Sequence, residues 1–331
     1  MRIAINGMGR IGRLLFRRLI SHPDFEVVAV NDIMPPDNLA YLVKYDSVYG
    51  TFPHTVTYRN GSLLVDAMTV TALQIQDPVS IPWEKMRVDV VLECAGKFSS
   101  YQGASGHLRS GASKVLLSTT GSGDIPLLIY GYNQDLVTAD THIISPGGCM
   151  TNCSVHILHL LSRFGIESAQ VNILHSYTSR QGLVDGPHQQ FRRGRAASES
   201  IIPVEIDLHH SLERLIPGLQ NRIAAVSTRV PVANGAMADF SVILEENTTV
   251  PDINRLFQQA AEGPLNGIVG YTEEPLVSLD IKGNTHSCLV DGTLTSIVGR
   301  HAKIIAWFDN EFGFTSRMID WLYYWKSKFS K

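Results

Sequence analysis

The chain has few cysteines, no long apolar run and no excess of positive charge, and each shortage excludes a class of protein. Four cysteines among 331 residues, without the spacing of a disulfide framework, indicate a reducing compartment, so we expect a cytoplasmic protein. No apolar run reaches the roughly 18 residues of a membrane span, and the first residues follow a strand pattern that leaves no room for a signal peptide. A net charge of −3 gives no reason to expect nucleic acid or a membrane as the main partner.

Repeats and low-complexity segments are also absent from the sequence. Hydrophobic residues make up 44% of the chain and charged residues 18%, which is ordinary for a globular protein and far from a disordered one. A chain of this length predicts about two domains with ample core. These bounds make a two-domain enzyme the expectation.

A glycine-rich turn lies between a strand and a helix at the start of the chain. Residues 2–6 form an apolar run, Gly7-Met-Gly-Arg-Ile-Gly12 follows, and 13–20 have helical periodicity. Gly7 allows the tight turn, Gly9 lets the backbone approach a pyrophosphate, and Gly12 permits close helix–strand packing. A second strand over 26–31 ends in Asp32, which is placed to bond the adenosine ribose hydroxyls and whose charge favours NAD over NADP. A chance glycine turn is the weaker interpretation, because strand, turn, helix and acid occur in order.

Later strands predict the rest of a doubly wound parallel sheet. Apolar runs over 88–94, 114–118 and 142–145 alternate with helical segments. Clusters of small and hydroxyl residues follow these strands at the carboxyl ends, where such sheets bind ligands. They are Ala95-Gly96 and Thr119-Thr120-Gly121.

Cys149 is the strongest candidate for a nucleophile. It follows Ser145-Pro-Gly-Gly148 and opens an apolar helical run. A helix N-terminus offers unpaired N–H groups and the positive end of the dipole, which favour thiolate over thiol. The alternative is a buried structural cysteine. Because the thiol emerges just after the last strand, we expect it beside the nicotinamide.

A histidine and an arginine-rich loop follow. The apolar strand over 170–178 contains His175 near its end, where an imidazole suits a Cys–His pair; an interior hydrogen-bonded histidine is the alternative. The loop over 178–195 then holds four arginines, which match phosphate geometry, although some could face solvent or a neighbouring subunit. They are Arg180, Arg192, Arg193 and Arg195.

The remainder predicts a mostly antiparallel sheet covered on one face. The expected strands are 223–232, 238–244, 275–281, 287–291 and 303–307. We expect helices over 250–262 and 314–326, the second after the polar turn 307–313.

A metal site is a further interpretation of the helix after Cys149. Cys149, Cys153, His156 and His159 are spaced four, three and three residues apart and so lie partly on one helix face. Zinc ligands usually come from separate elements, so we expect helix packing and no metal.

With these pieces in order, the sequence resembles glyceraldehyde-3-phosphate dehydrogenase and its sister, erythrose-4-phosphate dehydrogenase. The matching motifs span both ends of the chain: Ala4-Ile-Asn-Gly-Met-Gly-Arg-Ile-Gly-Arg13, Val30-Asn-Asp32, Lys44-Tyr-Asp46, Cys149-x-Thr-Asn-Cys153, His175-Ser-Tyr-Thr178, Gly194-Arg-Ala-Ala197, Ser200-Ile-Ile-Pro203, Arg229-Val-Pro231 and Asp309-Asn-Glu311.

The resemblance implies the fold, the cofactor and the roles of several residues. The fold is an N-terminal Rossmann domain over 1–148, an α+β catalytic domain over 149–312, and a C-terminal helix over 313–331 that packs back on the NAD-binding domain. Cys149 is the nucleophile, His175 its base, and Asn310 holds the nicotinamide amide. NAD contacts are expected from Asn6, Gly7, Gly9, Arg10, Ile11, Gly12, Asp32, Gly96, Ser118, Thr119 and Asn310. The substrate is a phosphorylated aldehyde, and the family forms homotetramers.

The sequence departs from the family pattern around the thiol. The family usually has Ser-Asn-Ala-Ser before the cysteine and threonine after it, where this chain has Ser-Pro-Gly-Gly148 and Met150. Val204-Glu-Ile-Asp207 likewise replaces a threonine segment and is more similar to the erythrose-4-phosphate branch. We therefore expect poor use of inorganic phosphate as acyl acceptor. The expected substrate contacts are Thr151, Thr178, Arg180, Arg195 and Arg229.

Two alternatives stay open. The first is a phosphorylating glyceraldehyde-3-phosphate dehydrogenase. The second is a non-catalytic regulatory paralogue, which the changes around the thiol favour and the joint retention of Cys149, His175, Asp32 and Asn310 opposes.

Overall fold

The computed structural model describes residues 1–329 and divides into two compact units. The first unit comprises Met1–Gly148 together with the segment from Met318 onward, and the second comprises Cys149–Arg317. Cys149 is thus the first residue of the second unit. Within the described residues, no helix combines the length and the apolar character needed to cross a bilayer.

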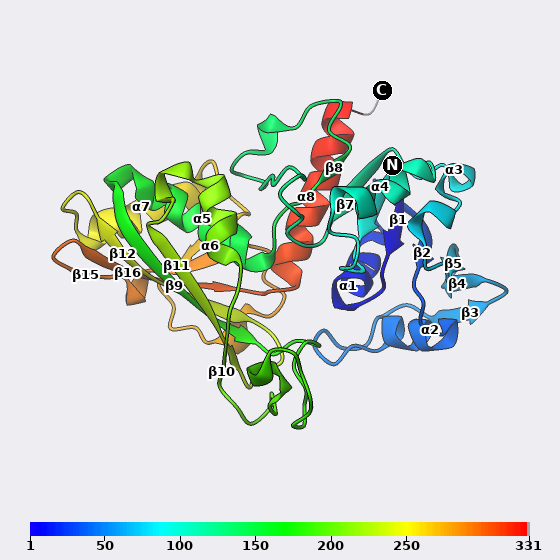
Figure 1. Cartoon of the computed structure of the whole chain (residues 1–331), viewed down its shortest axis with the longest axis horizontal. Coiled ribbons are helices and arrows are strands. Elements are labelled where there is room, and N and C mark those ends of the chain that lie inside the picture. Colours follow the sequence, from blue (N-terminus) through cyan, green and yellow to red (C-terminus); the bar gives the residue numbers. More distant parts are fainter. Residues whose placement is uncertain (330–331) are drawn as a thin grey trace. The chain divides into compact units, whose positions relative to one another are not determined.

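The first unit is built on a mostly parallel sheet with the strand order β3-β4-β5-β2-β1-β6-β7-β8 (Figure 1). All neighbours from β5 to β8 pair in parallel, whereas β3, β4 and β5 pair antiparallel at one edge. This confirms the predicted Rossmann class. The strands are β1 (Arg2–Asn6), β2 (Glu26–Asn31), β3 (Val56–Arg59), β4 (Ser62–Val65), β5 (Met68–Leu73), β6 (Val90–Glu93), β7 (Lys114–Leu117) and β8 (Ile143–Ile144).

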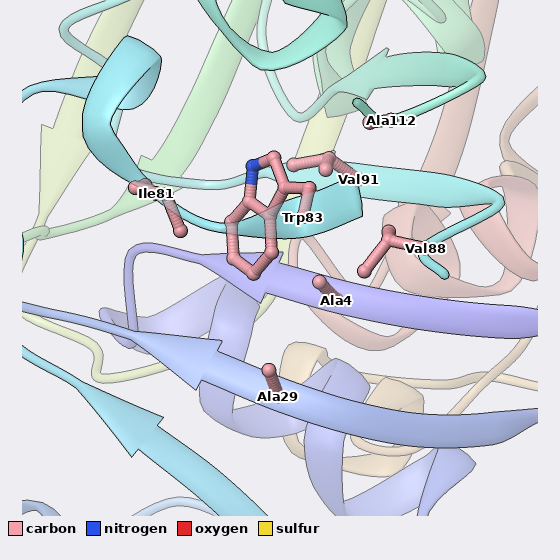
Figure 2. Packing of buried hydrophobic residues seen from close by; sticks show 7 residues of the cluster. All are labelled: Ala4, Ala29, Ile81, Trp83, Val88, Val91 and Ala112. Atoms are coloured by element: carbon pink, nitrogen blue, oxygen red, sulfur yellow. The ribbon is translucent and has the colours of Figure 1, made fainter. Parts of the chain in front are cut away.

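The central strands are apolar on both faces because helices and loops cover both sides of a parallel sheet. All four residues of β6 are buried. Against this sheet lies the fully buried indole of Trp83, surrounded by small side chains such as Ala4 on β1 and Ala29 on β2 (Figure 2). Small residues on the strands leave the room that the large ring fills.

Helices connect the strands of the first unit. They are α1 (Arg10–Leu19), α2 (Pro36–Lys44), α3 (Trp83–Met86) and α4 (Tyr101–Arg109), with short 3-10 turns η1 (Pro78–Ser80) and η2 (Gln134–Leu136). The last helix, α8 (Phe312–Phe329), contributes its residues from Met318 onward to this unit. There Lys326 pairs with Asp24, and the Tyr324 hydroxyl donates to Asp135 at 2.9 Å.

The second unit is built on a mostly antiparallel sheet with the order β10-β11-β9-β12-β16-β14-β13, and β15 pairs with β16. Within this second sheet, only β11–β9 and β13–β14 pair in parallel among the described strands. This confirms the predicted mostly antiparallel sheet. The strands are β9 (Ile166–Ser176), β10 (Ile202–Val204), β11 (Ile223–Val230), β12 (Ala236–Leu244), β13 (Val269–Thr272), β14 (Cys288–Asp291), β15 (Ser296–Val298) and β16 (His301–Phe308).

Three helices of the second unit lie over one face of this sheet (Figure 1). They are α5 (Cys149–Leu161), α6 (Leu208–Leu215) and α7 (Val250–Glu262), and the 3-10 turns are η3 (Ser162–Phe164), η4 (Phe191–Gly194), η5 (Pro217–Leu219), η6 (Ser278–Ile281) and η7 (Gly292–Leu294). α5 packs on β12 and β14, and nine of its thirteen residues are buried. The helix that begins at Cys149 is therefore anchored in the core.

One predicted strand is wrong. Residues 275–281 form a loop that ends in η6, because the Asp280 carboxylate accepts the N–H of Val277 at 2.9 Å and closes a turn. The exposure of Val277 and Leu279 shows that the apolar alternation there did not reflect a buried face. The apolar alternation in the short strands β10, β13 and β15 covers too few residues to predict a strand from the sequence.

Candidate functional site

A cavity of about 630 Å³ lies at the carboxyl ends of β1, β2, β5 and β6 in the first unit. Its walls include Asn6, Gly7, Gly9 and Asp32, four of the predicted dinucleotide contacts. They also include the residues after β5 and β6, which the sequence did not single out: Ile75, Gln76, Asp77, Pro78, Lys97 and Phe98. The carboxyl edge of a parallel sheet is where such folds bind ligands.

Each glycine of the turn is required for a different steric reason. Gly7 adopts φ +92°, and a Cβ there would lie 2.3 Å from the backbone nitrogen of Ala95. A Cβ on Gly12 would lie 2.0 Å from the carbonyl oxygen of Gly7. A Cβ on Gly9 would meet no protein atom within 4 Å, although Gly9 lines the cavity. Gly7 and Gly12 therefore serve packing, and Gly9 keeps space open for a ligand such as a pyrophosphate.

The Asp32 carboxylate lies at the end of β2 and is held by two backbone donors. Its Oδ2 accepts the N–H of Met8 at 2.6 Å, and its Oδ1 accepts the N–H of Met34 at 2.9 Å. Carboxylate oxygens have further lone pairs for hydroxyl donors. A cavity with a glycine turn on one wall and this acid on another fits the adenosine and pyrophosphate of NAD.

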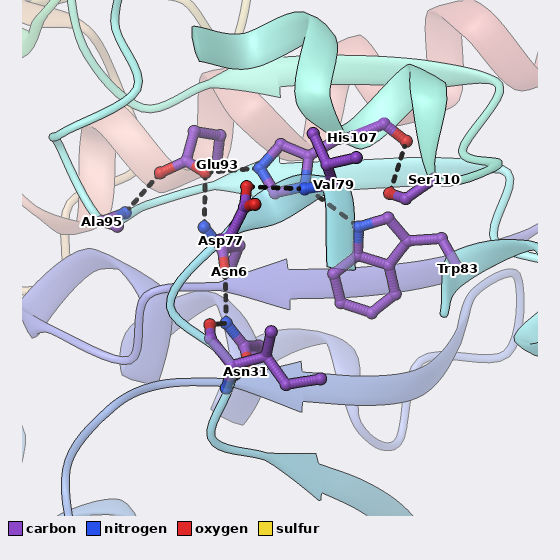
Figure 3. Close-up of polar contacts among 10 residues, drawn as sticks. Asn6, Asn31, Asp77, Val79, Trp83, Glu93, Ala95, His107 and Ser110 are labelled. Carbon is purple, nitrogen blue, oxygen red and sulfur yellow. Dashed lines mark hydrogen bonds and ion pairs between the residues drawn. The ribbon is translucent and has the colours of Figure 1, made fainter. Parts of the chain in front are cut away.

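A buried hydrogen-bond network supports this wall from beneath (Figure 3). Trp83 Nε1 donates to Nδ1 of His107 at 3.0 Å, and Nε2 of His107 lies 2.8 Å from Oε2 of Glu93. An indole can only donate, so Nδ1 accepts and Nε2 bears the hydrogen. Glu93 also accepts from the side chain of Asn6 at 2.6 Å and from the N–H of Ala95 at 2.7 Å. The Glu93 carboxylate thus holds both the end of β1 and the turn after β6, which flank the cavity.

The network continues across the sheet to the opposite wall. Oδ1 of Asn6 accepts from Nδ2 of Asn31 at 2.7 Å (Figure 3). Oδ1 of Asn31 in turn accepts the N–H of Ile75 at 2.8 Å. The ends of β1, β2 and β6 and the loop after β5 are therefore fixed together.

The other predicted cofactor residues lie outside the cavity lining. Arg10 in the first turn of α1 pairs with Asp46 at 2.6 Å, and Ile11 and Gly12 follow it in the same helix. Gly96 follows β6, while Ser118 and Thr119 follow β7. Their contact with the dinucleotide stays a prediction.

The second unit brings Cys149 and His175 together. Cys149 opens α5, His175 lies near the end of β9, and Sγ of Cys149 is 3.8 Å from Nε2 of His175. The imidazole is buried, whereas the cysteine keeps part of its surface exposed. Sulfur also accepts backbone N–H groups at the start of the helix, from Cys149 itself and from Met150. This is the geometry of a nucleophile and its base.

Burial opposes charge on both groups in the ligand-free protein. Burial raises the pKa of Cys149 to about 11, although the charge of Arg229 and the helix N–H groups act in the opposite direction. The pKa of His175 is lowered to about 3 by burial and then by the charge of Arg229. Burial of the pair thus opposes the thiolate that the helix position favours.

Three arginines gather beside this pair. Arg229 on β11 and Arg193 on η4 are 7% and 8% exposed, and Arg180 is exposed in the loop after β9. The charges of Arg193 and Arg180 help burial to lower the pKa of Arg229 to about 10. Such mutual repulsion without an intervening carboxylate is typical of an anion site.

Unsatisfied donors point to the same conclusion. Nη1 of Arg193, Nε of Arg229 and Nε2 of Gln181 are buried and have no hydrogen-bond partner among the described residues. The side-chain oxygen Oε1 of Gln181 accepts from the Thr178 hydroxyl at 3.0 Å. Buried donors are normally paired, so a ligand with several acceptors would complete this cluster.

The structure does not bring Arg195 into the cluster. Its side chain is 66% exposed and pairs with Asp185 at 2.8 Å. Arg193, two residues earlier, is buried instead, and a role for Arg195 in substrate binding stays a prediction. The loop contains several arginines in one polar stretch, so only the η4 turn distinguishes them. Thr151 is buried in the first turn of α5.

Asn310 lies between β16 and α8 in the second unit. Its Oδ1 accepts the N–H of Gly235 at 2.9 Å and the hydroxyl of Ser176 at 3.3 Å. The amide is thereby oriented with its oxygen fixed, which leaves Nδ2 as the group able to donate to a ligand.

Metal ligation has no geometric basis in the part of the chain that the structure describes. No three side chains of His, Cys, Asp and Glu there are grouped as a metal would require. Cys153 and His156 are fully buried in α5, and the Cys153 thiol is hydrogen-bonded to that of Cys288.

Comparisons with known proteins agree over most of the chain. The NAD binding domain of glyceraldehyde 3-phosphate dehydrogenase matches residues 1–101, and the C-terminal domain of the same enzyme matches residues 148–310. The chain is 39% identical over 326 residues to glyceraldehyde-3-phosphate dehydrogenase of Zymomonas mobilis subsp. mobilis, covering 97% of each protein. It is 38% identical over 323 residues to glyceraldehyde-3-phosphate dehydrogenase 2 of Bacillus subtilis, covering 97% of this chain and 95% of that one. It is 40% identical over 324 residues to glyceraldehyde-3-phosphate dehydrogenase of Kitasatospora aureofaciens, covering 97% of this chain and 98% of that one.

Proposed function

Because the chain belongs to the glyceraldehyde-3-phosphate dehydrogenase family and is an NAD-dependent oxidoreductase acting on an aldehyde, we propose that it oxidises a phosphorylated aldose through a thioester on Cys149. The observation that best supports this is the 3.8 Å approach of the Cys149 sulfur to His175 Nε2. A cluster of three arginines beside that pair supplies charge for the phosphate.

In the proposed first step the Cys149 sulfur attacks the aldehyde carbon. His175 takes the thiol proton through Nε2 and donates it to the oxygen of the tetrahedral adduct. It takes this proton back when the hydride leaves, so that the carbonyl of the thioester forms. The N–H groups at the start of α5 stabilise the developing negative charge. When bound, NAD supplies the acceptor for the hydride that leaves the aldehyde carbon, and a thioester then remains on Cys149.

The arginine cluster is proposed to bind the anionic parts of the substrate. Arg229 and Thr178 would hold the phosphate of the aldehyde, with Arg180 at the open side of the cluster. Arg193 joins this set because its buried Nη1 has no partner among the described residues. Arg195 is a weaker candidate because Asp185 already pairs with it.

The acyl acceptor is proposed to be water more than inorganic phosphate, as in the erythrose-4-phosphate branch. No hydroxyl side chain occurs in the stretch Pro146-Gly-Gly-Cys-Met150 before and at the thiol, and Ile206 follows β10. A desolvated phosphate dianion needs several donors at once.

A second candidate is the phosphorylating reaction, in which inorganic phosphate takes the acyl group. The relatives compared above are all named glyceraldehyde-3-phosphate dehydrogenase. Buried Arg193 favours the phosphorylating reaction, because this residue adds a donor beyond the substrate contacts that the sequence predicted. The two candidates differ in product. Purified protein with NAD and glyceraldehyde 3-phosphate or erythrose 4-phosphate should form reduced NAD, and we expect a free acid. Steep phosphate dependence with an accumulating acyl phosphate would favour the second candidate, and no aldehyde oxidation would refute both.

We also propose a cytoplasmic homotetramer. Four free cysteines are consistent with a reducing compartment. The loop between β9 and β10 exposes Leu183, Val184 and Phe191 at 64%, 79% and 88%, an apolar set that assembly would cover. Sedimentation should show four chains per particle, and Phe191→Ser should shift the mass distribution towards smaller species. A wild-type monomer at micromolar concentration would refute the tetramer.

A further inference from the structure

Asp309 is a fully buried residue in the turn between β16 and α8. Its Oδ1 accepts the N–H groups of Glu311 and Phe312 at 2.9 and 2.8 Å, which closes the turn into α8. Its Oδ2 accepts the N–H of Gly283 at 2.8 Å, in the loop after η6. A buried carboxylate is costly unless several donors hold it, so this group binds together the segments that supply those donors.

Two further hydrogen bonds join this turn to the turn between β11 and β12. Oδ1 of Asp309 also accepts from Nδ2 of Asn234 at 3.1 Å. The next residue on each side makes a second contact, in which the N–H of Gly235 donates to Oδ1 of Asn310 at 2.9 Å. Two consecutive residues of one turn are thus bonded to two consecutive residues of the other in a closed ring. Gly235 has φ +88°, which residues with a side chain rarely adopt, so the turn itself sets the direction of its N–H.

The ring determines which end of the Asn310 amide a ligand can meet. Oδ1 of Asn310 accepts from Gly235 and also from the Ser176 hydroxyl at 3.3 Å. If the amide turned over, its Nδ2 would face the N–H of Gly235, and two donors cannot bond to each other. Nδ2 therefore stays available, and the ligand group beside it must be an acceptor. The carbonyl oxygen of a carboxamide is such an acceptor.

We propose that Asp309 is a positioning residue for the nicotinamide of NAD and that it acts through Asn310. The Asp309 carboxylate holds Asn234 and, with it, the N–H of Gly235. That N–H keeps the Asn310 amide turned so that Nδ2 donates to the carbonyl oxygen of the nicotinamide carboxamide. Asp309 itself has no contact with the cofactor. This inference rests on the proposed function only in identifying the ligand group beside Asn310 as nicotinamide.

The test compares the affinities of NAD and ADP-ribose, measured by calorimetry without an aldehyde. ADP-ribose retains the adenosine and pyrophosphate and lacks the nicotinamide, so a general loss of folded protein lowers both signals together. Asp309→Asn places an amide among the donors of the turn, and in either orientation its NH₂ group faces a backbone N–H. We expect about tenfold weaker NAD binding and ADP-ribose binding within about twofold of the wild type.

Asp291→Asn is the matched control, because Asp291 is also a buried aspartate of the second unit that accepts from a backbone N–H and from an indole. It should lower the melting temperature and leave the ratio of the two affinities unchanged. Asn234→Ala carries the test if Asp309→Asn does not fold, because it removes one bond of the ring and retains the Asp309 carboxylate. It should weaken NAD binding about threefold, again without an effect on ADP-ribose.

A double variant shows whether Asp309 acts through Asn310. Asn310→Ala should lower NAD affinity at least as much as Asp309→Asn, and combining it with Asp309→Asn or Asn234→Ala should lower NAD affinity no further. Additive losses, a parallel loss of ADP-ribose affinity, the same change of ratio in Asp291→Asn, or a wild-type ratio in Asn310→Ala would each overturn the positioning role. Failure to oxidise any phosphorylated aldehyde would instead refute the proposed function, because neither binding measurement depends on turnover.

Discussion

At the residue scale, the four thiols of the chain differ in their surroundings. Cys149 keeps exposed surface, accepts helix N–H groups and lies beside His175, whereas Cys153 and Cys288 are fully buried. Burial and the charge of Glu93 raise the pKa of Cys94. We therefore predict that iodoacetamide labels Cys149 first. Cys149→Ser should reduce turnover at least a thousandfold and leave NAD binding nearly unchanged. Peptide mapping and NAD titration check this, and equal labelling of Cys94 or Cys288 would contradict it.

The pKa values of the resting pair predict a pH profile. A thiol whose pKa is raised to about 11 forms more thiolate as pH rises, so alkylation of the ligand-free enzyme should increase from pH 6 to pH 10 without a plateau. The pKa of His175 is lowered to about 3, so its imidazole is already neutral throughout this window and adds no step near pH 6.5. Stopped-flow alkylation measures the profile. A plateau reached below pH 8 would show that a preformed thiolate exists.

The position of Asp32 predicts that the enzyme prefers NAD to NADP. Its carboxylate lines the cavity and would face the 2′-phosphate of NADP, so Asp32→Gly should lower the ratio of NAD to NADP efficiency by one to two orders of magnitude. The variant also removes an acceptor for the N–H of Met8, so NAD affinity should fall. Asp37→Asn, at an exposed acid in α2, is the matched control. Equal wild-type activity with both dinucleotides would contradict the assignment.

At the scale of elements, the dinucleotide wall depends on Glu93 at the end of β6. Glu93→Gln places an amide donor among donors from Asn6, His107 and Ala95, and an unsatisfied buried group costs about 1–3 kcal/mol. We predict about tenfold weaker NAD binding with an unchanged rate of Cys149 alkylation.

The control for that prediction is Trp83→Phe, which removes one donor at the far end of the same network. It should lower the melting temperature and leave NAD affinity within about twofold. Calorimetric NAD titration and thermal unfolding separate the two effects. If both variants lose stability and NAD affinity in parallel, Glu93 has no specific role in positioning the cavity wall.

Most elements could be predicted because their apolar patterns were long or their turns chemically distinctive. The helix over 250–262 and the strand over 26–31 agree with the structure at both ends. The 275–281 prediction failed because a side-chain turn from Asp280 outweighed apolar alternation. The choice between Arg193 and Arg195 depended on a short 3-10 turn, and the state of the thiol depended on burial by residues distant in sequence. Neither has a local signal.

At the scale of the whole molecule, the two compact units divide the requirements of the reaction. The first provides the cavity that fits NAD, and the second provides the thiol, the imidazole and the arginine cluster. The two units match the two domains of a single enzyme family, so we assign both to one reaction. Under the proposed mechanism, the fate of the acyl group would depend on how many donors an attacking phosphate finds near Cys149.

The most direct test of the account is a single-turnover experiment with NAD and erythrose 4-phosphate or glyceraldehyde 3-phosphate, quenched and mapped by mass spectrometry. We predict a burst of one reduced NAD per chain, with an acyl group of the oxidised substrate on the Cys149 peptide. Cys149→Ser should show neither. An acyl group on another residue, or reduction of NAD without any acyl-enzyme, would contradict a thioester mechanism at Cys149.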